Sequence, residues 1–280
     1  MKNKIVLITG ANSGIGKATA TRLAIMGAYI VMLCRNKERG ETARQDIIQT
    51  SGNNNIELIL IDLTDLGSVR KAAEEIKAKY DHIDVMLNNA GGYFEKRKTS
   101  KDGYEYTFAM NHLGHFLLTN LLLDELKAAV NARIINLSSD IHKKGHIYFD
   151  DLMTEKKYKG FGVYSHAKLA NILFTNELSR RLQHTNITVN TLHPGMVRTN
   201  FTSDASRFIK FMMTIMGRFL KSPEKGAETS VYLASSKEVD RISGKYFVNR
   251  KEKKSSPESY DEKVAKKLWK VSCELTGLDI

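Results

Sequence analysis

A glycine-rich turn near the amino terminus constrains the fold of this chain more than any other feature. The apolar run Ile5–Ile8 predicts a buried strand that leads directly into the turn Thr9–Gly16, whose spacing is G-x-x-x-G-x-G. A helix with apolar residues at helical spacing follows from about Gly14, and the run Tyr29–Leu33 predicts a second strand. This order of elements predicts a strand-helix-strand unit and an α/β fold.

Such a turn can hold the phosphates of a dinucleotide. Glycines let a backbone approach a pyrophosphate closely, and the free N–H groups and the dipole at a helix start favour its negative charge. The spacing departs from the G-x-G-x-x-G fingerprint, so an ordinary tight turn is the alternative interpretation. The candidate cofactor contacts here are Gly10, Asn12, Ser13, Gly14, Ile15 and Gly16.

Length and composition favour one domain in the cytoplasm. A chain of 280 residues can form a single α/β domain, so we expect one dinucleotide-binding domain over residues 1–280. No apolar stretch is long enough to span a bilayer, and Met1–Lys4 leads at once into the first strand, which leaves no room for a signal peptide. We therefore expect a cytoplasmic protein without a transmembrane segment.

Cysteines and charge argue against several other classes of protein. Cys34 and Cys273 are too far apart in the sequence to indicate a disulfide framework or a metal-binding pair. The net charge of +12 is compatible with nucleic acid, but no recognised nucleic-acid module accompanies it. The densest basic run, Arg250–Lys254, is typical of a solvated surface loop and opens a C-terminal extension over residues 250–280. We expect neither nucleic acid nor a metal as a partner.

The end of the second strand carries a basic residue where an acidic one is common. In an NAD-binding unit, an acidic residue about twenty positions after the glycines binds the ribose 2′-hydroxyl. Here Arg35 and Asn36 stand near that position, and an arginine can pair with a 2′-phosphate. The sequence therefore favours NADP(H) over NAD(H), with Lys17 and Lys37 as possible helpers, while a solvent-facing arginine is the alternative.

Two further predicted strands end in polar or small residues. The strand Ile56–Ile61 stops at Asp62, which can accept a hydrogen bond from an adenine amine or cap the next helix. The strand Ile83–Leu87 runs into Asn88–Gly92, where small residues let a flat ligand lie against the backbone. Ligands of an open parallel sheet sit beyond the carboxyl ends of its strands, so we expect these turns to converge, with a polar turn at the sheet edge as the alternative. The candidate contacts are Asp62, Leu63, Asn89, Ala90 and Gly91.

One long helix is expected over Asp102–Ala128. It is largely apolar all round, as a buried or interface helix would be, and Asn111 is a polar exception. His112 and His115 have no carboxylate or cysteine at a ligand spacing, so we interpret them as packing histidines and predict no metal.

A serine pair and a tyrosine-lysine pair follow. The strand Arg133–Leu137 ends at Ser138 and Ser139, and a later helix holds Tyr164 and Lys168 four residues apart, which places them on one helix face. A nearby ammonium and a cationic nicotinamide both favour the phenolate, so we expect the tyrosine pKa to fall toward a value useful for proton transfer. Taken alone, the pair could be an ordinary exposed one.

In this order the motifs resemble those of the short-chain dehydrogenase/reductase family. The likeness covers about residues 4–200, and parts of it look most like the NADP(H)-preferring retinol dehydrogenase branch. It implies a Rossmann fold, a doubly wound parallel sheet of about seven strands with helices on both faces. The motifs are Thr9-Gly10-x-x-x-Gly14-x-Gly16, Asn88-Asn89-Ala90-Gly91, Asn111, Ser139, Tyr164-x-x-x-Lys168 and Pro194-Gly195.

The resemblance also implies roles for single residues. Tyr164 would be the general acid/base, and Lys168 would activate it and bind a ribose. Ser139, the second serine of its pair as in the family, would hold the substrate oxygen, and Asn111 would help to maintain a proton-relay water. The positions that match those closing over the nicotinamide and its phosphates are Pro194, Gly195, Val197 and Thr199.

A stretch near residues 207–221 is apolar with basic residues at its edges. We expect residues 200–222 to form a substrate lid over a hydrophobic pocket. A peripheral membrane helix and ordinary core packing are the alternatives.

We therefore expect an NADP(H)-dependent oxidoreductase that interconverts a hydrophobic aldehyde or ketone and its alcohol. Alkoxide charge that develops on the substrate oxygen can be stabilised by hydrogen bonds from Ser139 and Tyr164. The alternatives are an NADP(H)-sensing regulator or scaffold with little turnover, and a nucleic-acid-binding protein. The family often forms dimers or tetramers, so the resemblance is compatible with a homodimer or a homotetramer.

Overall fold

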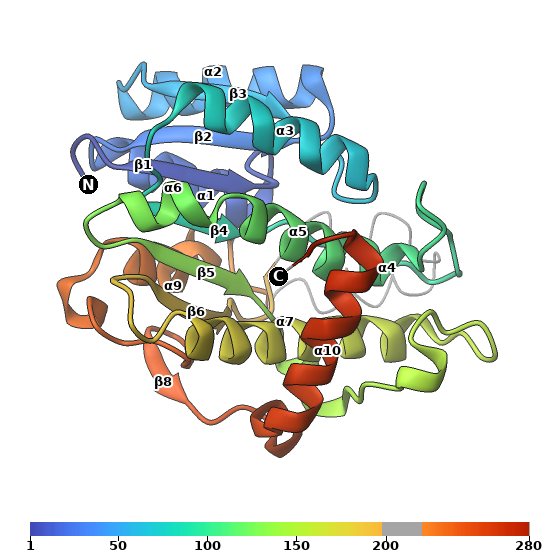
Figure 1. Ribbon diagram of the computed structural model, residues 1–280. Coiled ribbons are helices and arrows are strands. Elements are labelled where there is room, and N and C mark those ends of the chain that lie inside the picture. Colours follow the sequence, from blue (N-terminus) through green and yellow to red (C-terminus); the bar gives the residue numbers. More distant parts are fainter. Residues whose placement is uncertain (198–219, 280) are drawn as a thin grey trace.

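A computed structural model describes residues 1–197 and 220–279 of the chain, and one eight-stranded sheet runs through this described part (Figure 1). The strands are β1 (Ile5–Thr9), β2 (Tyr29–Cys34), β3 (Ile56–Leu60), β4 (Val85–Asn88), β5 (Arg133–Leu137), β6 (Thr188–His193), β7 (Tyr246–Val248) and β8 (Lys251–Lys253). Their order in the sheet is β3-β2-β1-β4-β5-β6-β7-β8, and every neighbouring pair is parallel except β7 and β8. The predicted α/β Rossmann-type fold is confirmed.

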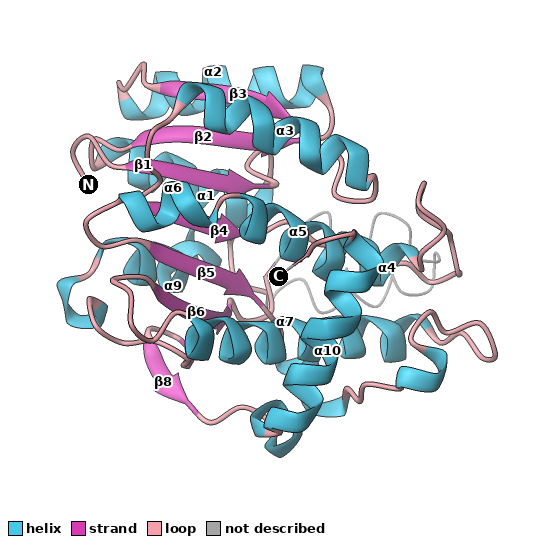
Figure 2. Ribbon diagram, in the orientation of Figure 1, coloured by secondary structure: helices cyan, strands magenta, loops and turns pink. Residues whose placement is uncertain are grey.

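Helices cover both faces of the sheet (Figure 2). One face carries α1 (Gly14–Ile25), α2 (Lys37–Ser51) and α9 (Pro223–Ser235). The other carries α3 (Leu66–Lys79), α5 (Gly114–Leu121), α6 (Leu123–Ala128) and α7 (Gly160–Arg181), with α10 (Glu262–Thr276) packed across α5 and α7. Short 3-10 turns are η2 (Asp140–Lys144), η3 (Phe149–Asp151), η6 (Lys237–Val239) and η7 (Pro257–Tyr260).

The apolar runs of the strands follow from this double cover. Neighbouring side chains of a strand point to opposite faces of the sheet, so in β1 Val6 and Ile8 pack under α1 while Leu7 packs toward α5. Both faces of β1 and β2 are covered, and these two strands are accordingly apolar at nearly every position rather than at alternate ones.

The helix predicted over Asp102–Ala128 is wrong in its start and in its continuity. The observed helical stretch begins with α4 (Tyr106–Phe108), because the Glu105 carboxylate accepts hydrogen bonds from the N–H groups of Thr107 and Phe108, at 2.9 and 2.7 Å. It then passes through a π-helical turn, η1 (Ala109–Leu113), and is interrupted again at Leu122. The π turn lies at the position of Asn111, as such turns often do at functional sites.

The basic run Arg250–Lys254 was predicted to be a loop, but it contributes the edge strand β8. Asn249 and Arg250, at φ values of 52° and 63°, form the two-residue turn between β7 and β8. Two successive positive φ values suit the turn type that joins tight hairpins. All three residues of β8 are exposed, as the predicted solvation requires, and the sheet has eight strands rather than about seven.

Candidate active site

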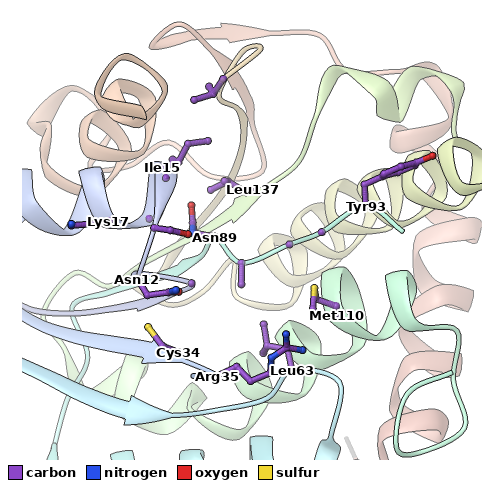
Figure 3. Close-up of a pocket in the computed structure, with 18 of the residues that line it drawn as sticks. Asn12, Ile15, Lys17, Cys34, Arg35, Leu63, Asn89, Tyr93, Met110 and Leu137 are labelled. Carbon is purple, nitrogen blue, oxygen red and sulfur yellow. The ribbon is translucent and has the colours of Figure 1, made fainter. Parts of the chain in front are cut away.

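The carboxyl ends of the parallel strands meet along one side of a cleft of about 1460 Å³ (Figure 3). Each described residue predicted to contact a cofactor lines this cleft, and Figure 3 shows Asn12, Arg35, Leu63 and Asn89 around it. The segments that meet here follow β1, β2, β3, β4, β5 and β6, as expected for a doubly wound sheet. Thr199 lies outside the described residues.

The glycine turn after β1 is shaped as a cradle. Gly10 and Gly14 have φ values of +67° and +53°, in the left-handed region that favours glycine. A Cβ on Gly16 would lie 2.4 Å from the Gly10 carbonyl oxygen and 2.5 Å from Asn89 Nδ2, so the third glycine permits a close approach of two backbone segments. Ser13, the N-cap of α1, makes no side-chain cap, and the first turn carries no acidic residue. This helix start therefore presents N–H groups and a positive dipole end to the cleft.

The segment after β4 is tied to the end of β1. Asn89 Nδ2 donates to the Thr9 carbonyl oxygen at 2.8 Å, and the N–H groups of Asn89 and Ala90 both donate to Thr9 Oγ1 at 2.9 Å. Asn89 Oδ1 is buried and has no hydrogen-bond partner among the described residues. The two backbone segments are thus held together, and an acceptor is left over beside the glycine cradle.

Arg35 stands at the edge of the cleft, directly after β2. Its side chain is 58% exposed, and its Nη1 lies 3.9 Å from Asp62 Oδ2 and donates to the Tyr106 hydroxyl at 2.8 Å. Asn36, also a predicted contact, lines the cleft and caps α2 by accepting from the Arg39 N–H at 2.8 Å. Arg35 is therefore neither buried nor free of partners in this arrangement.

Only one of the two helper residues predicted for Arg35 lies at the cleft. Lys17 lines the cleft, where it pairs with Asp46 at 2.6 Å, whereas Lys37 does not line it. Arg39 lines it instead, a residue that the sequence analysis missed. A signal was available, because a basic residue in the first turn of a helix opposes the helix dipole and so points to an anionic neighbour.

Asp62 lines the cleft but does not cap the next helix, so the capping interpretation is wrong. Its Oδ1 accepts from the N–H and the hydroxyl of Thr64, at 2.9 and 2.7 Å, so it stabilises the turn after β3. It also lines the cleft, with Leu63 beside it. The cap of α3 is Asp65, which accepts from the Ser68 N–H at 3.1 Å.

The predicted catalytic pair lies on α7 and faces the end of β5. Lys168 is buried, with its Nζ 3.3 Å from the Leu137 carbonyl oxygen and 5.5 Å from the centre of the Tyr164 ring. Tyr164 is hydrogen-bonded to the side chain of Ser139, which follows β5. Ser138 instead donates to the Lys168 carbonyl oxygen at 2.7 Å. The structure thus brings together Tyr164, Lys168 and the second serine of the pair.

Burial decides the pKa values of this pair. It raises the pKa of Tyr164, against a smaller lowering by the Ser139 hydrogen bond, and it lowers the pKa of Lys168 to about 7. In a dry site the charged form of each group is disfavoured, so phenol and amine move toward their neutral forms. In the protein without a bound cofactor, the pKa of Tyr164 is therefore raised, and the predicted fall is wrong for this state.

Asn111 does not line the cleft, but its amide oxygen points toward it. Its Nδ2 donates to the carbonyl oxygens of Gly92 and Thr107, at 3.0 and 2.8 Å, and its Oδ1 is buried without a partner among the described residues. A Cβ on Gly91 would lie 2.6 Å from this Oδ1 and 3.2 Å from Lys168 Nζ. The unpaired acceptor and the amine therefore face the same glycine.

An aromatic wall adjoins Tyr164. The Tyr93 ring is 4.7 Å from the ring of Phe161 and 6.4 Å from that of Tyr164, measured between centroids, and Phe94 lies 4.7 Å from Tyr106. Tyr93, Phe94 and Met110 line the cleft, yet the sequence analysis did not single them out. The sequence did contain a signal for this wall, because the large aromatic residues Tyr93 and Phe94 directly follow the small residues at the end of β4.

The predicted lid over residues 200–222 falls largely outside the described residues, as does most of the alternative membrane segment 207–221. The described residues that flank the gap are joined, since the Lys221 N–H donates to the Met196 carbonyl oxygen at 2.8 Å. Leu220 and Met196 both line the cleft.

His112 and His115, which were predicted to pack in the interior, are both buried. Over residues 1–197 and 220–279, no group of three or more His, Cys, Asp or Glu side chains is arranged to hold a metal ion. No helix in these same ranges is long and apolar enough to cross a membrane.

The residues that line the cleft fit a nicotinamide dinucleotide. The glycine cradle and the helix start suit a pyrophosphate, and Arg35 with Arg39 suits a further phosphate. Small residues after β4 and the unpaired acceptors Asn89 Oδ1 and Asn111 Oδ1 leave room and hydrogen-bonding capacity for a flat polar ring.

Comparison with known proteins agrees with this geometry. Residues 4–209 match the family model of short chain dehydrogenases. Human retinol dehydrogenase 14 is 45% identical over 99% of this chain and 88% of its own length, and human retinol dehydrogenase 13 is 46% identical over 99% and 85%. An uncharacterised protein from Mycobacterium Paratuberculosis has a crystal structure that superposes with a TM-score of 0.82, at 33% identity over 99% of this chain and 95% of that one.

A short chain dehydrogenase from Shigella flexneri, crystallised in complex with NADP, has the same fold, with a TM-score of 0.71 at 22% identity over 90% of this chain and 98% of that one. The match of the family model extends over most of the sequence, and the two retinol dehydrogenases align with nearly all of it. The chain therefore belongs to the short-chain dehydrogenase/reductase family of oxidoreductases.

Proposed function

We propose that this protein is an NADP(H)-dependent oxidoreductase that interconverts a hydrophobic aldehyde or ketone and its alcohol. The observation that carries the proposal is the group formed by Tyr164, hydrogen-bonded to Ser139 and adjacent to the buried Lys168, at the wall of the cleft that the glycine turn also lines. Names of relatives support it, since several of them are retinol dehydrogenases.

The preference for NADP(H) is argued from charge. Arg35 and Arg39 line the cleft next to the end of β2, where a 2′-phosphate would need cationic partners. Arg35 stands near the position where an NAD-binding unit usually has an acidic residue. The Shigella flexneri dehydrogenase in complex with NADP supports the same choice. When bound, this cofactor supplies or accepts the hydride.

The chain's own residues supply the proton and stabilise charge. Tyr164 donates its proton to the substrate oxygen, while Ser139 stabilises the negative charge that develops there. Lys168, with its Nζ 5.5 Å from the centre of the Tyr164 ring, is proposed to activate Tyr164 and to bind a ribose. Because burial raises the pKa of Tyr164, the phenol stays protonated near neutral pH, which supports the reductive direction.

The substrate is proposed to be hydrophobic because of the wall beside Tyr164. Tyr93 is buried, Phe161 and Met196 are exposed large apolar residues, and Met110 lines the cleft. Such a surface gains free energy by covering an apolar substrate and offers few polar partners for a sugar or an acid.

The test is NADPH consumption with a panel of hydrophobic aldehydes and ketones, including retinal, by the native protein and Tyr164→Phe. We expect the variant to lose at least about a hundredfold in kcat, the range associated with general acid catalysis, while it binds NADPH as before. Tyr148→Phe is the matched control, since Tyr148 is exposed and does not line the cleft.

Two results would reject the proposal in different ways. Tight NADPH binding by the native protein without turnover of any carbonyl would favour a regulator or scaffold. Turnover that survives in Tyr164→Phe would remove the phenol from the chemistry.

Four further expectations belong to this proposal. We propose that residues 1–280 form one domain, that residues 200–222 cover the substrate, and that the protein is cytoplasmic and binds no nucleic acid. Fractionation of cells that express the full chain, with membranes washed at high salt, tests the location. Sedimentation of the purified protein distinguishes a monomer from a homodimer or a homotetramer.

A further inference from the structure

His115 is a buried histidine that the chemistry above does not use. It lies on α5, is 2% exposed, and contacts two parts of the site through its two ring nitrogens. Its Nε2 is 2.9 Å from Thr9 Oγ1, at the end of β1, and its Nδ1 is 3.2 Å from the carbonyl oxygen of Asn111. The imidazole therefore spans the distance between the cofactor turn and the π turn that carries Asn111.

The direction of each hydrogen bond follows from its partners. A carbonyl oxygen only accepts, so His115 Nδ1 must carry the proton and donate to Asn111. Burial lowers the pKa of His115 to about 3, so the ring is neutral at ordinary pH and its Nε2 is an acceptor. Thr9 must then donate its hydroxyl proton to Nε2.

Thr9 uses its full hydrogen-bonding capacity in this arrangement. Its Oγ1 accepts from the N–H groups of Asn89 and Ala90, which occupies both lone pairs, and its proton goes to His115. The Leu87 carbonyl oxygen, the other acceptor nearby, is 3.5 Å away, at the outer limit for a hydroxyl donor. A continuous chain of hydrogen bonds thus runs from the segment after β4, through Thr9 and His115, to Asn111.

We propose that His115 is a positioning residue that fixes the Asn89–Ala90 segment of the cofactor site relative to the helix that carries Asn111. The inference rests on the proposed function, because that function makes the Asn89–Ala90 segment a cofactor contact and places Asn111 in the same active site. It differs from simple packing because a ring of the same shape without nitrogens cannot replace the imidazole.

The experiment compares His115→Phe with His112→Phe. His112 is the matched control, because it is equally buried, lies three residues earlier, and uses its Nε2 on Ser272 of α10, at 3.0 Å. We expect His115→Phe to raise the Kd for NADPH about tenfold, the scale of a lost buried hydrogen-bond bridge, and to lower kcat. His112→Phe should lower the melting temperature and leave both constants near those of the native protein.

A second readout needs no bound cofactor. Amide hydrogen exchange of Asn89 and Ala90 reports the bonds to Thr9 directly, and we expect it to accelerate in His115→Phe but not in His112→Phe. Thr9→Val and Thr9→Ser extend the test if His115→Phe folds poorly, since serine keeps the hydroxyl and valine does not. We expect Thr9→Ser to retain NADPH affinity and Thr9→Val to lose it.

The outcomes separate the inference from the proposed function. If the native protein neither binds NADPH nor turns over a carbonyl, the proposed function fails, whatever the variants do. If the native protein does both, and His115→Phe matches His112→Phe in Kd, kcat and amide exchange, then His115 is only a packing residue and the inference is overturned.

Discussion

The Arg35 guanidinium donates a 2.8 Å hydrogen bond to the hydroxyl of Tyr106. Arg35 follows β2 and Tyr106 opens α4, so this bond joins two segments that line the cleft. Arg39 lines the same cleft, and we propose that Arg35 pairs there with the 2′-phosphate of the cofactor. The arrangement leads to a prediction about which cofactor the protein prefers.

Replacing Arg35 with leucine should weaken binding of NADPH and leave NADH almost unchanged. Hydrogen bonds to charged groups contribute about 1.5–3 kcal/mol, so we expect the Kd for NADPH to rise about tenfold to a hundredfold. Fluorescence titration of the protein with each cofactor measures both constants. Lys37→Leu is the control, because Lys37 does not line the cleft. Equal weakening of NADPH and NADH in Arg35→Leu would show that Arg35 does not read the 2′-phosphate.

A methyl group on Gly91 should disturb catalysis more than folding. The Cβ of Gly91→Ala would lie 2.6 Å from Asn111 Oδ1 and 3.2 Å from Lys168 Nζ, so these two side chains must move apart. A misplacement of about 1 Å can cost about a hundredfold in rate, and we expect a loss of that order in kcat. Steady-state kinetics and thermal unfolding of the same preparation measure the two effects.

Gly162→Ala is the control for this substitution. Gly162 lies near Tyr164 on α7, and a Cβ there would meet its neighbours at an ordinary 3.7 Å. We expect native activity and unchanged or slightly higher stability. A normal kcat in Gly91→Ala would mean that Asn111 and Lys168 can separate without harm.

The sequence predicted the parallel sheet well because its signals are local. Apolar runs such as Ile5–Ile8 end in glycines or polar residues at each strand end, and the positions of these residues decide where the site lies. The described residues predicted to contact the cofactor, from Gly10 to Val197, accordingly line one cleft. Ser139, predicted over Ser138 as the catalytic serine, is the one that is hydrogen-bonded to Tyr164.

Three features could not be predicted from the sequence, because each depends on contacts that form only in the folded protein. The pKa of Tyr164 was expected to fall, but burial, which no spacing reports, raises it. The hydrogen bonds of His115 could not be predicted, because Thr9 is remote in the sequence and Asn111 is contacted through its backbone oxygen. The start of α4 was misplaced because Glu105 caps it, while the apolar pattern continues on both sides of the cap.

Substitutions of the two serines after β5 should have different effects, one on catalysis and the other on stability. Ser139 contacts the Tyr164 hydroxyl, so Ser139→Ala should lower kcat by about a hundredfold or more, as losing one oxyanion donor does. Ser138 donates to the Lys168 carbonyl oxygen, so Ser138→Ala should reduce the free energy of unfolding by about 1 kcal/mol with most activity retained. Kinetics and urea unfolding of both variants test this, and a reversed pattern would move the catalytic role to Ser138.

Lys168 should make the stability of the protein depend on pH. Burial lowers its pKa from the usual 10.5 to about 7, so between these values the unfolded chain binds a proton that the folded protein does not. Stability rises with pH wherever the unfolded state binds more protons, and this group's contribution should therefore improve from about pH 7 to about pH 10.5. Below pH 7 the folded protein carries the full cost of a buried charge.

Lys168→Met removes that cost and should change the pH profile accordingly. We expect the variant to be more stable than the native protein at pH 6, with an advantage that shrinks steadily toward pH 10. Urea unfolding of both proteins at intervals over this range measures the difference, and Lys157→Met, at an exposed position, should keep the native profile. A difference between Lys168→Met and the native protein that stays constant over the whole range would mean that the buried amine keeps its ordinary pKa.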